Sequence, residues 1–184
     1  MLETIKGVSG VFGKVNQIGM VVRSCEDSAR KWSRLGIRPW YRGNTPEEGV
    51  VLYRGNETRL SVDIALGYMG DVQVELIEVK GKEPNIYTEH LERHGEGIHH
   101  LGFFVYGINK KAAVLEAAGI RPLQSGVIPS KGGAVTTYAY YDTAGYCGTI
   151  LELIETKLVG IPLKMTRFMM RVGTLTGDAS RMKL

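Results

Sequence analysis

The sequence has little cysteine and no long hydrophobic run. Cys25 and Cys147 are the only cysteines among 184 residues, and they do not form a Cys-x-x-Cys pair. Two thiols so far apart indicate reduced side chains in a cytoplasmic protein, not a disulfide framework or a thiolate zinc site. No apolar stretch approaches the roughly 20 residues that cross a bilayer, and the N-terminus lacks the apolar core of a signal peptide. We therefore expect a cytoplasmic protein without a membrane partner.

Excess positive charge is also missing from most of the chain. Residues 157–184 carry six basic side chains and one acidic side chain, Asp178, so this segment has a net charge of +5 and the rest has −1. Nucleic-acid-binding domains carry their basic residues on the folded face that meets the phosphates. We expect no nucleic-acid partner. The basic tail could contact an acidic cofactor such as coenzyme A or a neighbouring subunit, but a solvated surface is the more common role of such a segment.

The sequence does contain an internal repeat. Three short strings recur in the same order: Gln17-Ile18-Gly19 as His100-Leu101-Gly102, Gly36-Ile37-Arg38-Pro39 as Gly119-Ile120-Arg121-Pro122, and Glu75-Leu76-Ile77-Glu78 as Glu152-Leu153-Ile154-Glu155. The first two pairs are separated by 83 positions and the third by 77. Ordered matches at nearly constant spacing predict two copies of one supersecondary unit.

Each copy is predicted to contain a strand, a helix and then about three strands. Hydrophobic patterning and turn residues place the elements, and Ser24 and Gly36 are expected to begin and end the first helix. The chain then divides into an arm (1–14), a first βαβββ module (15–79), a linker with a short helix (80–96), a second βαβββ module (97–156) and the basic tail (157–184). Within the tail, residues 163–172 have loosely helical spacing, and 173–184 are expected to be mobile.

Two pairs of equivalent positions hold side chains that can bind a metal ion: Gln17 with His100, and Glu75 with Glu152. A carboxylate between apolar neighbours on a strand is costly to bury without a partner. Taken singly, each residue is more often a surface group or a hydrogen-bonded core residue, but the equivalence of both pairs favours a shared cation. The oxygen-rich donor set suits one divalent ion (Co, Mn, Ni, Mg or Zn) with about two positions open for water or substrate.

The double βαβββ arrangement, with Gly97-Ile98-His99-His100-Leu101-Gly102 opening the second half and Gly148-Thr149-Ile150-Leu151-Glu152-Leu153 closing it, resembles the vicinal oxygen chelate superfamily. Glyoxalase I, methylmalonyl-CoA epimerase, extradiol dioxygenases and bleomycin-resistance proteins belong to it. The resemblance covers residues 15–156. It implies an α+β fold whose two modules form a cupped mixed sheet, with Gln17, Glu75, His100 and Glu152 as metal ligands. We also expect a homodimer.

The ligand set separates the branches of that superfamily. Gln17 at the first position disfavours the dioxygenases, which hold iron with two histidines and one carboxylate, and bleomycin-type binders lack the ligand set altogether. The set resembles some glyoxalase I enzymes, but Val21, Val79 and Glu96 stand where those enzymes hold glutathione. Thr45-Pro46-Glu47-Glu48-Gly49-Val50-Val51 resembles methylmalonyl-CoA epimerase, although Leu52 occupies the position of its base. Both substrate types, thioester and hemithioacetal, therefore stay open.

The chemistry that we expect is proton transfer at a carbon next to a carbonyl group of a small-molecule substrate. Glu152 is the first candidate for the base and Glu75 the second. Tyr138 and Tyr140 share one strand face and either line the pocket or belong to the core. The alternative is a non-catalytic binding protein that uses the same cleft to hold a small molecule.

Overall fold

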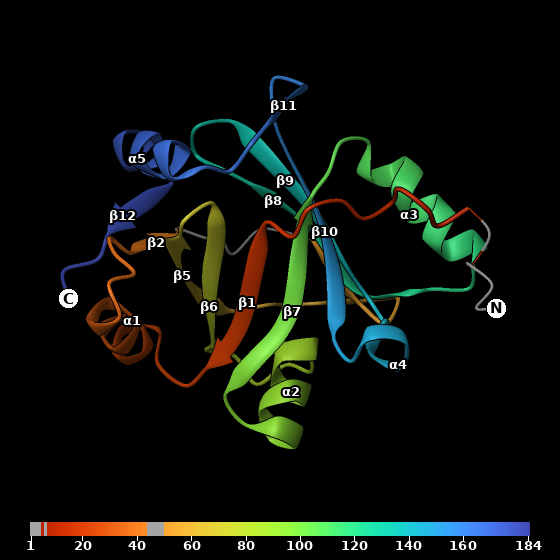
Figure 1. Ribbon diagram of the computed structural model, residues 1–184, viewed down its shortest axis with the longest axis horizontal. Helices are drawn as coiled ribbons and strands as arrows, with labels where there is room; N and C mark the ends of the chain where they lie inside the picture. Colours follow the sequence, from red (N-terminus) through yellow and green to blue (C-terminus); the bar gives the residue numbers. More distant parts are fainter. Residues whose placement is uncertain (1–4, 6, 44–49) are drawn as a thin grey trace.

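A computed structural model describes residue 5 and residues 7–43 and 50–184 (Figure 1). The beginning of the predicted arm and the predicted turn at 45–49 lie outside these residues. In the described part, helices and strands alternate along the chain in two similar halves, followed by a C-terminal addition.

The first module contains strands, one helix and an additional hairpin: β1 (Gln17–Val22), α1 (Cys25–Arg34), β2 (Tyr41–Gly43), β3 (Val51–Tyr53), β4 (Asn56–Thr58), β5 (Val62–Met69) and β6 (Val72–Val79). The hydroxyl of Ser24 accepts a hydrogen bond from the Asp27 amide, as expected for the residue that caps a helix. Gly36 follows the helix with φ of 88°, a conformation that favours glycine.

A short helix, α2 (Ile86–His94), joins the halves, and a capping box between Asn85 and Thr88 fixes its start. The second module then repeats the order of the first: β7 (Gly97–Phe104), α3 (Ile108–Ala117), β8 (Pro122–Pro129), β9 (Ala134–Tyr141), α4 (Ala144–Cys147) and β10 (Ile150–Leu158). The prediction of two βαβββ units is confirmed.

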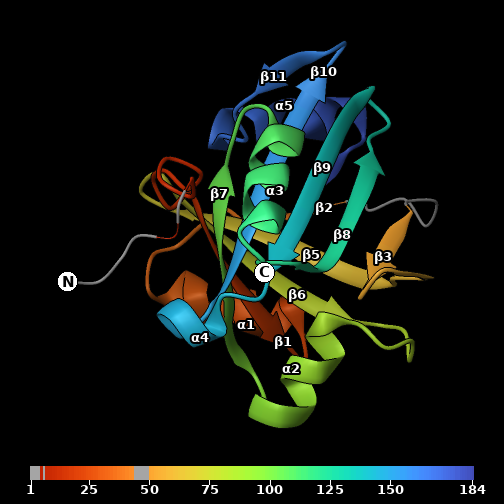
Figure 2. The ribbon, with the colours of Figure 1, turned by 90° about the vertical axis from the view of Figure 1, so that its right-hand side faces the viewer.

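The two modules form one mixed sheet that curls into a half-barrel (Figures 1 and 2). In each module the first strand runs parallel to the last, so β1 pairs with β6 and β7 pairs with β10. The modules join where β1 and β7 pair in antiparallel fashion. The predicted cupped α+β fold is therefore confirmed, and the two modules pair with each other within one chain.

The additional hairpin links the modules a second time. Arg54 and Gly55 both have positive φ and form its two-residue turn. Its first strand, β3, pairs with β8 of the other module, from Val51↔Gly126 to Tyr53↔Gln124. This exchange covers the edge of β8, which would otherwise leave backbone groups unpaired.

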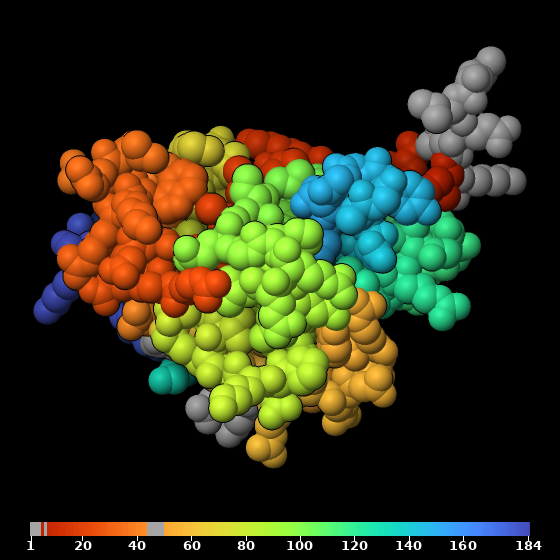
Figure 3. Space-filling view, turned by 90° about the horizontal axis from the view of Figure 1, so that it is seen from below, coloured from red at the N-terminus to blue at the C-terminus, as the bar shows by residue number. Residues whose placement is uncertain are grey.

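Helices cover the outer face of the sheet. In α1, Cys25 and Ala29 are fully buried against Trp40 and Leu76, and in α3 the buried Leu115 packs against Leu153. Seen from below, the surface is built by α1 in orange, α2 in yellow-green and α4 in blue (Figure 3). None of the described helices is long and apolar enough to cross a membrane. The helices on the outer face leave the concave face of the sheet uncovered.

The basic tail folds back over the sheet. It contains β11 (Ile161–Leu163), α5 (Arg167–Thr176) and β12 (Ala179–Arg181). Since α5 begins at Arg167, the helical spacing of the tail does form a helix. The expectation that residues 173–184 are mobile is wrong, because α5 runs to Thr176 and β12 adds a strand to the edge of β2. Figures 1 and 2 place α3 on one side of β10 and α5 on the other.

Candidate metal centre

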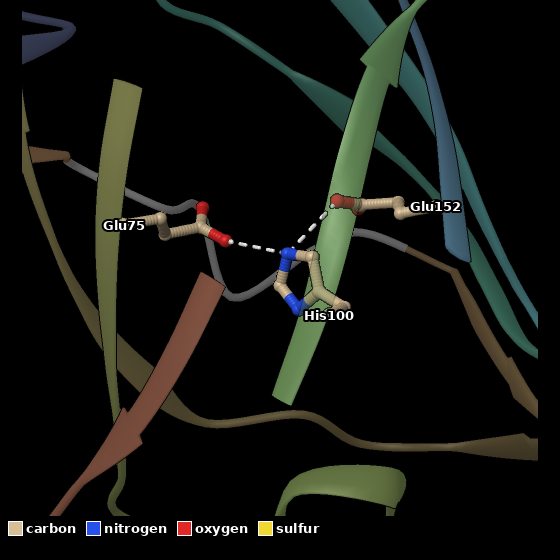
Figure 4. Close-up of side chains that lie close together, drawn as sticks. All are labelled: Glu75, His100 and Glu152. Carbon is tan, nitrogen blue, oxygen red and sulfur yellow. Dashed lines mark ion pairs between the residues drawn. The ribbon is translucent and has the colours of Figure 1, made fainter. Parts of the chain in front are cut away.

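The four residues singled out in the sequence lie together on the central strands. Their polar atoms surround Nε2 of His100, which lies 3.1 Å from Oε2 of Glu152, 3.3 Å from Oε1 of Gln17 and 3.5 Å from Oε2 of Glu75. Figure 4 shows both carboxylates directed at the imidazole from opposite sides. Glu75 and Gln17 come from the first module, and His100 and Glu152 from the second. We call these residues the four-residue cluster.

Strand register explains why the repeat brings them together. Gln17 lies beside Gln73, two residues before Glu75, and His100 lies beside Ile150, two residues before Glu152. Side chains two residues apart on a strand point to the same face. The antiparallel β1–β7 pairing then places the two halves face to face.

Two glycines make room for the cluster. Gly19 lies opposite His100 across the β1–β7 pair, and Gly102 lies opposite Gln17. A methyl group on Gly19 would be 1.8 Å from the His100 ring, and one on Gly102 would be 2.6 Å from Oε1 of Gln17. The glycine two residues after Gln17 therefore leaves space for His100, and the glycine two residues after His100 leaves space for Gln17.

Neighbouring side chains orient the first-module amide. Nε2 of Gln17 donates to Oε1 of Gln73 at 2.8 Å, and Nε2 of Gln73 donates to the Tyr68 hydroxyl at 2.8 Å. These bonds turn the amide oxygen of Gln17 toward the cluster. No sequence signal marks Gln73 or Tyr68, because the repeat has no polar counterpart at Ile150, the position equivalent to Gln73.

His99 orients the imidazole in the same way. Its Nδ1 lies 3.0 Å from Nδ1 of His100. Burial lowers the pKa of His99 well below the ordinary histidine value, and the neighbouring His100 and His90 lower it further, which favours the neutral form of His99. In that form Nδ1 of His99 can accept a hydrogen bond from Nδ1–H of His100, while Nε2 of His100 faces the carboxylates. Such an orienting partner is usual for a histidine that binds a metal ion.

The cluster is buried and rich in charge. His100 is fully buried, and Glu152 is only 3% exposed. Burial alone would lower the pKa of His100, but Glu152 and Glu75 raise it to about 9. Burial raises the pKa of Glu152, against the effect of His100. An imidazolium between two carboxylates balances part of this charge when no ion is present.

The donor set fits a divalent cation. One ligand atom from each of Glu75, His100 and Glu152 lies within 4.8 Å of the others. Oε2 of Glu152 is buried and accepts no hydrogen bond of normal geometry from the described residues. A positive ion would stabilise two buried carboxylates that lie this close together. Three oxygens and one nitrogen suit Co, Mn, Ni, Mg or Zn.

A cavity of about 310 Å³ opens on the concave face, and Gln17, Glu75 and Glu152 lie in its lining. Tyr138 and Tyr140 also line it, so the two tyrosines belong to the pocket as well as to a buried apolar cluster. The Tyr87 hydroxyl donates to the Tyr140 hydroxyl at 2.8 Å. This volume lies in the range of small-molecule sites.

Comparison with known proteins agrees with this architecture. The model of the Glyoxalase/Bleomycin resistance protein/Dioxygenase superfamily matches residues 16–141. No curated protein matches the chain.

Among solved structures, hypothetical protein BH1468 from Bacillus halodurans C-125 is 22% identical, with a TM-score of 0.59 over 78% of this chain and 94% of that one. A variant of Streptomyces coelicolor methylmalonyl-CoA epimerase in complex with 2-nitronate-propionyl-CoA is 17% identical (TM-score 0.59, 78% of this chain and 96% of that one). Methylmalonyl-CoA epimerase from Mycobacterium tuberculosis is 15% identical (TM-score 0.56, 84% and 91%). At these identities, the structures establish the shared fold.

Proposed function

Because the chain belongs to the glyoxalase/bleomycin resistance protein/dioxygenase superfamily, we propose that it is a divalent-metal-dependent enzyme that transfers a proton at the carbon next to a carbonyl group. The observation that carries the proposal is that the four-residue cluster converges at Nε2 of His100 and that three of its members, Gln17, Glu75 and Glu152, line one cavity. The two epimerases of the same fold make an epimerase or isomerase acting on a thioester the first candidate. A lyase of the glyoxalase I type, acting on a hemithioacetal, is the second.

In this proposal, Gln17, Glu75, His100 and Glu152 hold the ion. When bound, such an ion supplies Lewis acidity at a carbonyl oxygen of the substrate. The chain prepares the ligands beforehand: Gln73 holds the amide of Gln17, and His99 holds the imidazole of His100. Ligands fixed in this way need no reorganisation when a substrate enters.

Glu152 is the proposed base. Its carboxylate takes the proton from the carbon next to the carbonyl group. The C–H bond breaks, a carboxyl O–H bond forms, and the electron pair of the C–H bond moves toward the carbonyl oxygen. Glu152 stands on the second module and Glu75 on the first, on opposite sides of His100 (Figure 4). If the carboxyl group of Glu75 carries a second proton and delivers it to the other face of the carbon, the configuration inverts, Glu75 is left as a carboxylate and Glu152 keeps the proton that it removed. Return of the first proton by Glu152 retains the configuration.

The test is solvent exchange. The purified chain, loaded with Co²⁺, is incubated in D₂O with a panel of acyl-CoA thioesters and glutathione hemithioacetals, and deuterium at the carbon is measured by mass spectrometry. We expect exchange with at least one class. Glu152→Gln should lower its rate by about 10²–10⁴-fold, the usual contribution of a general base. Glu92→Gln, at an exposed position of α2, serves as the matched control.

Two outcomes would contradict the proposal. The first is a chain that binds no divalent ion. The second is exchange at an unchanged rate in Glu152→Gln. A chain that binds a panel compound tightly without any exchange would support the alternative, a non-catalytic binding protein of the same fold.

A further inference from the structure

We propose that the cavity selects a substrate whose carbonyl-bearing body is apolar and uncharged, and that the basic tail supplies the wall that recognises it. The inference rests on the proposed function, because it takes the four-residue cluster as the place of the carbonyl group. It adds the chemical class of the remainder of the substrate.

The first argument is the charge of the cavity lining. Among the described residues, no lysine, arginine or histidine lines the cavity, and its only charged side chains are the acids Glu75, Glu152 and Asp178. The Asp178 carboxylate is already occupied, since it accepts hydrogen bonds from the Gly132 amide at 3.0 Å and the Thr176 hydroxyl at 2.6 Å. A carboxylate or phosphate of a substrate would therefore lose its hydration without meeting a cationic side chain, which is costly.

Second, the rest of the cavity lining is mostly apolar. Away from the cluster, side chains of both modules contribute Leu60, Val62, Ile64, Leu66, Ile128 and Ile154. The tail contributes Met165, Met169, Met170 and Val172 from the opposite side. Methionine side chains are flexible and adapt to apolar ligands of different shape. Apolar side chains therefore make up most of the lining, and beyond the cluster its polar side chains include Ser130, Thr136, Thr156, Thr176 and Asp178.

The third argument is that the tail is fastened in place. Arg167 donates to the Tyr68 carbonyl at 3.2 Å, and β12 pairs with β2. Met170 is 5% exposed and packs with Tyr41 and Tyr68. On the other module, Asp178 holds the turn at Gly132. The wall therefore spans from one module to the other and has a fixed position over the cavity.

The basic side chains of the tail do not enter the cavity. Arg167 is bonded to the backbone of Tyr68, and Arg171 is exposed. If the substrate is a coenzyme A thioester, its phosphates stay outside and only the acyl group enters. The family match ends at residue 141, so this wall comes from beyond the matched region.

The experiment measures binding without turnover. Uncharged N-acetylcysteamine thioesters with butanoyl, hexanoyl and octanoyl groups are titrated calorimetrically into the Co²⁺-loaded full chain. The Kd should fall about fourfold for each added CH₂, the effect of burying one methylene. The thioester of hexanedioic acid, which has the same chain length as the hexanoyl compound but ends in a carboxylate, should bind at least about tenfold more weakly.

A charge placed in the wall tests the role of the tail. Met169→Lys adds a cation to the lining, so it should weaken octanoyl binding by at least about tenfold and strengthen binding of the hexanedioyl compound. Leu175→Lys is the matched control on the outer face of α5, where Leu175 is 87% exposed, and should leave both Kd values unchanged. Circular dichroism of each variant verifies that α5 is retained.

The two proposals fail in different ways. A Kd that does not change with chain length, or equal binding of the hexanoyl and hexanedioyl compounds, would overturn the inference even if deuterium exchange occurs. Chain-length-dependent binding without exchange for any thioester would overturn the proposed catalysis and leave the apolar selectivity standing. Equal effects of Met169→Lys and Leu175→Lys would remove the tail from recognition.

Discussion

Replacement of Gly19 by alanine should damage the proposed metal centre through a single methyl group. The new Cβ would lie 1.8 Å from Cε1 and 2.1 Å from Nε2 of His100. Non-bonded carbon atoms pack at about 3.5–4.0 Å, so the ring must move by more than about 1 Å. His100 is fully buried on a central strand, and therefore has little room to move.

The expected losses follow from this displacement. Forcing an extra methyl group into a packed interior costs about 1–3 kcal/mol, which for a chain of this size lowers Tm by about 2–12 °C. The ring also leaves a position that is 3.1 Å from Glu152 and 3.5 Å from Glu75. Misplacement of one ligand should lower metal affinity by about 10–100-fold, as loss of an orienting partner does.

Calorimetric titration with Co²⁺ and thermal unfolding of the metal-free chain measure the two effects separately. Gly145→Ala is the control, because a methyl group there meets no atom within 4 Å and Gly145 lacks a positive φ. If Gly19→Ala and Gly145→Ala both bind Co²⁺ with the Kd of the natural chain and unfold at its Tm, the close approach of β1 and β7 at this point is refuted.

Four further predictions concern pH, thiols and the core. The acids around His100 raise its pKa to about 9 despite burial, so metal binding at pH 7 must release a proton from the imidazole. The Kd for Co²⁺ should therefore fall about tenfold per pH unit from 7 to 9. A Kd that stays constant over this range would contradict the prediction. The same raised pKa means that the stabilisation of the metal-free chain by His100 is complete below about pH 6.5 and disappears as pH rises through about 9, which urea unfolding at pH 6, 7.5 and 10 can detect. Burial and the neighbouring Glu78 and Asp63 raise the pKa of the Cys25 thiol to about 12, whereas the Cys147 side chain is exposed. A thiol reagent at pH 8 should therefore modify only Cys147 in the native chain and both cysteines after denaturation. Leu115→Ala removes a fully buried side chain of α3 and should cost about 2–5 kcal/mol of stability, while the Kd for Co²⁺ of the folded fraction stays unchanged because α3 lies on the outer face.

The repeat allowed much of the fold and the candidate site to be predicted from the sequence. Equivalent glycines, prolines and apolar residues mark equivalent places in two copies, so Gln17 and His100, or Glu75 and Glu152, had to occupy related strands. Local periodicity encodes strands and helices, and the short helix predicted within residues 80–96 is α2. The limits of the modules along the chain stay a prediction.

Other features depend on partners that lie far apart in the sequence. The hairpin of β3 and β4 pairs with β8 of the second module. Gln73 and His99 orient Gln17 and His100 through hydrogen bonds that no local sequence pattern predicts. The tail is the clearest case. Residues 173–184 contain glycine, threonine and charged side chains that give no strong periodic signal, and only the open edge of β2 and the apolar cavity decide where they lie.

The sequence by itself determined that the chain is a duplicated βαβββ scaffold with four metal-capable side chains at equivalent positions, because duplication preserves spacing and residue type. Only the tertiary structure decided that Gly19 and Gly102 make room for His100 and Gln17 and that α5 lines the cavity. Both depend on distances between strands and segments that meet only after the sheet has curled.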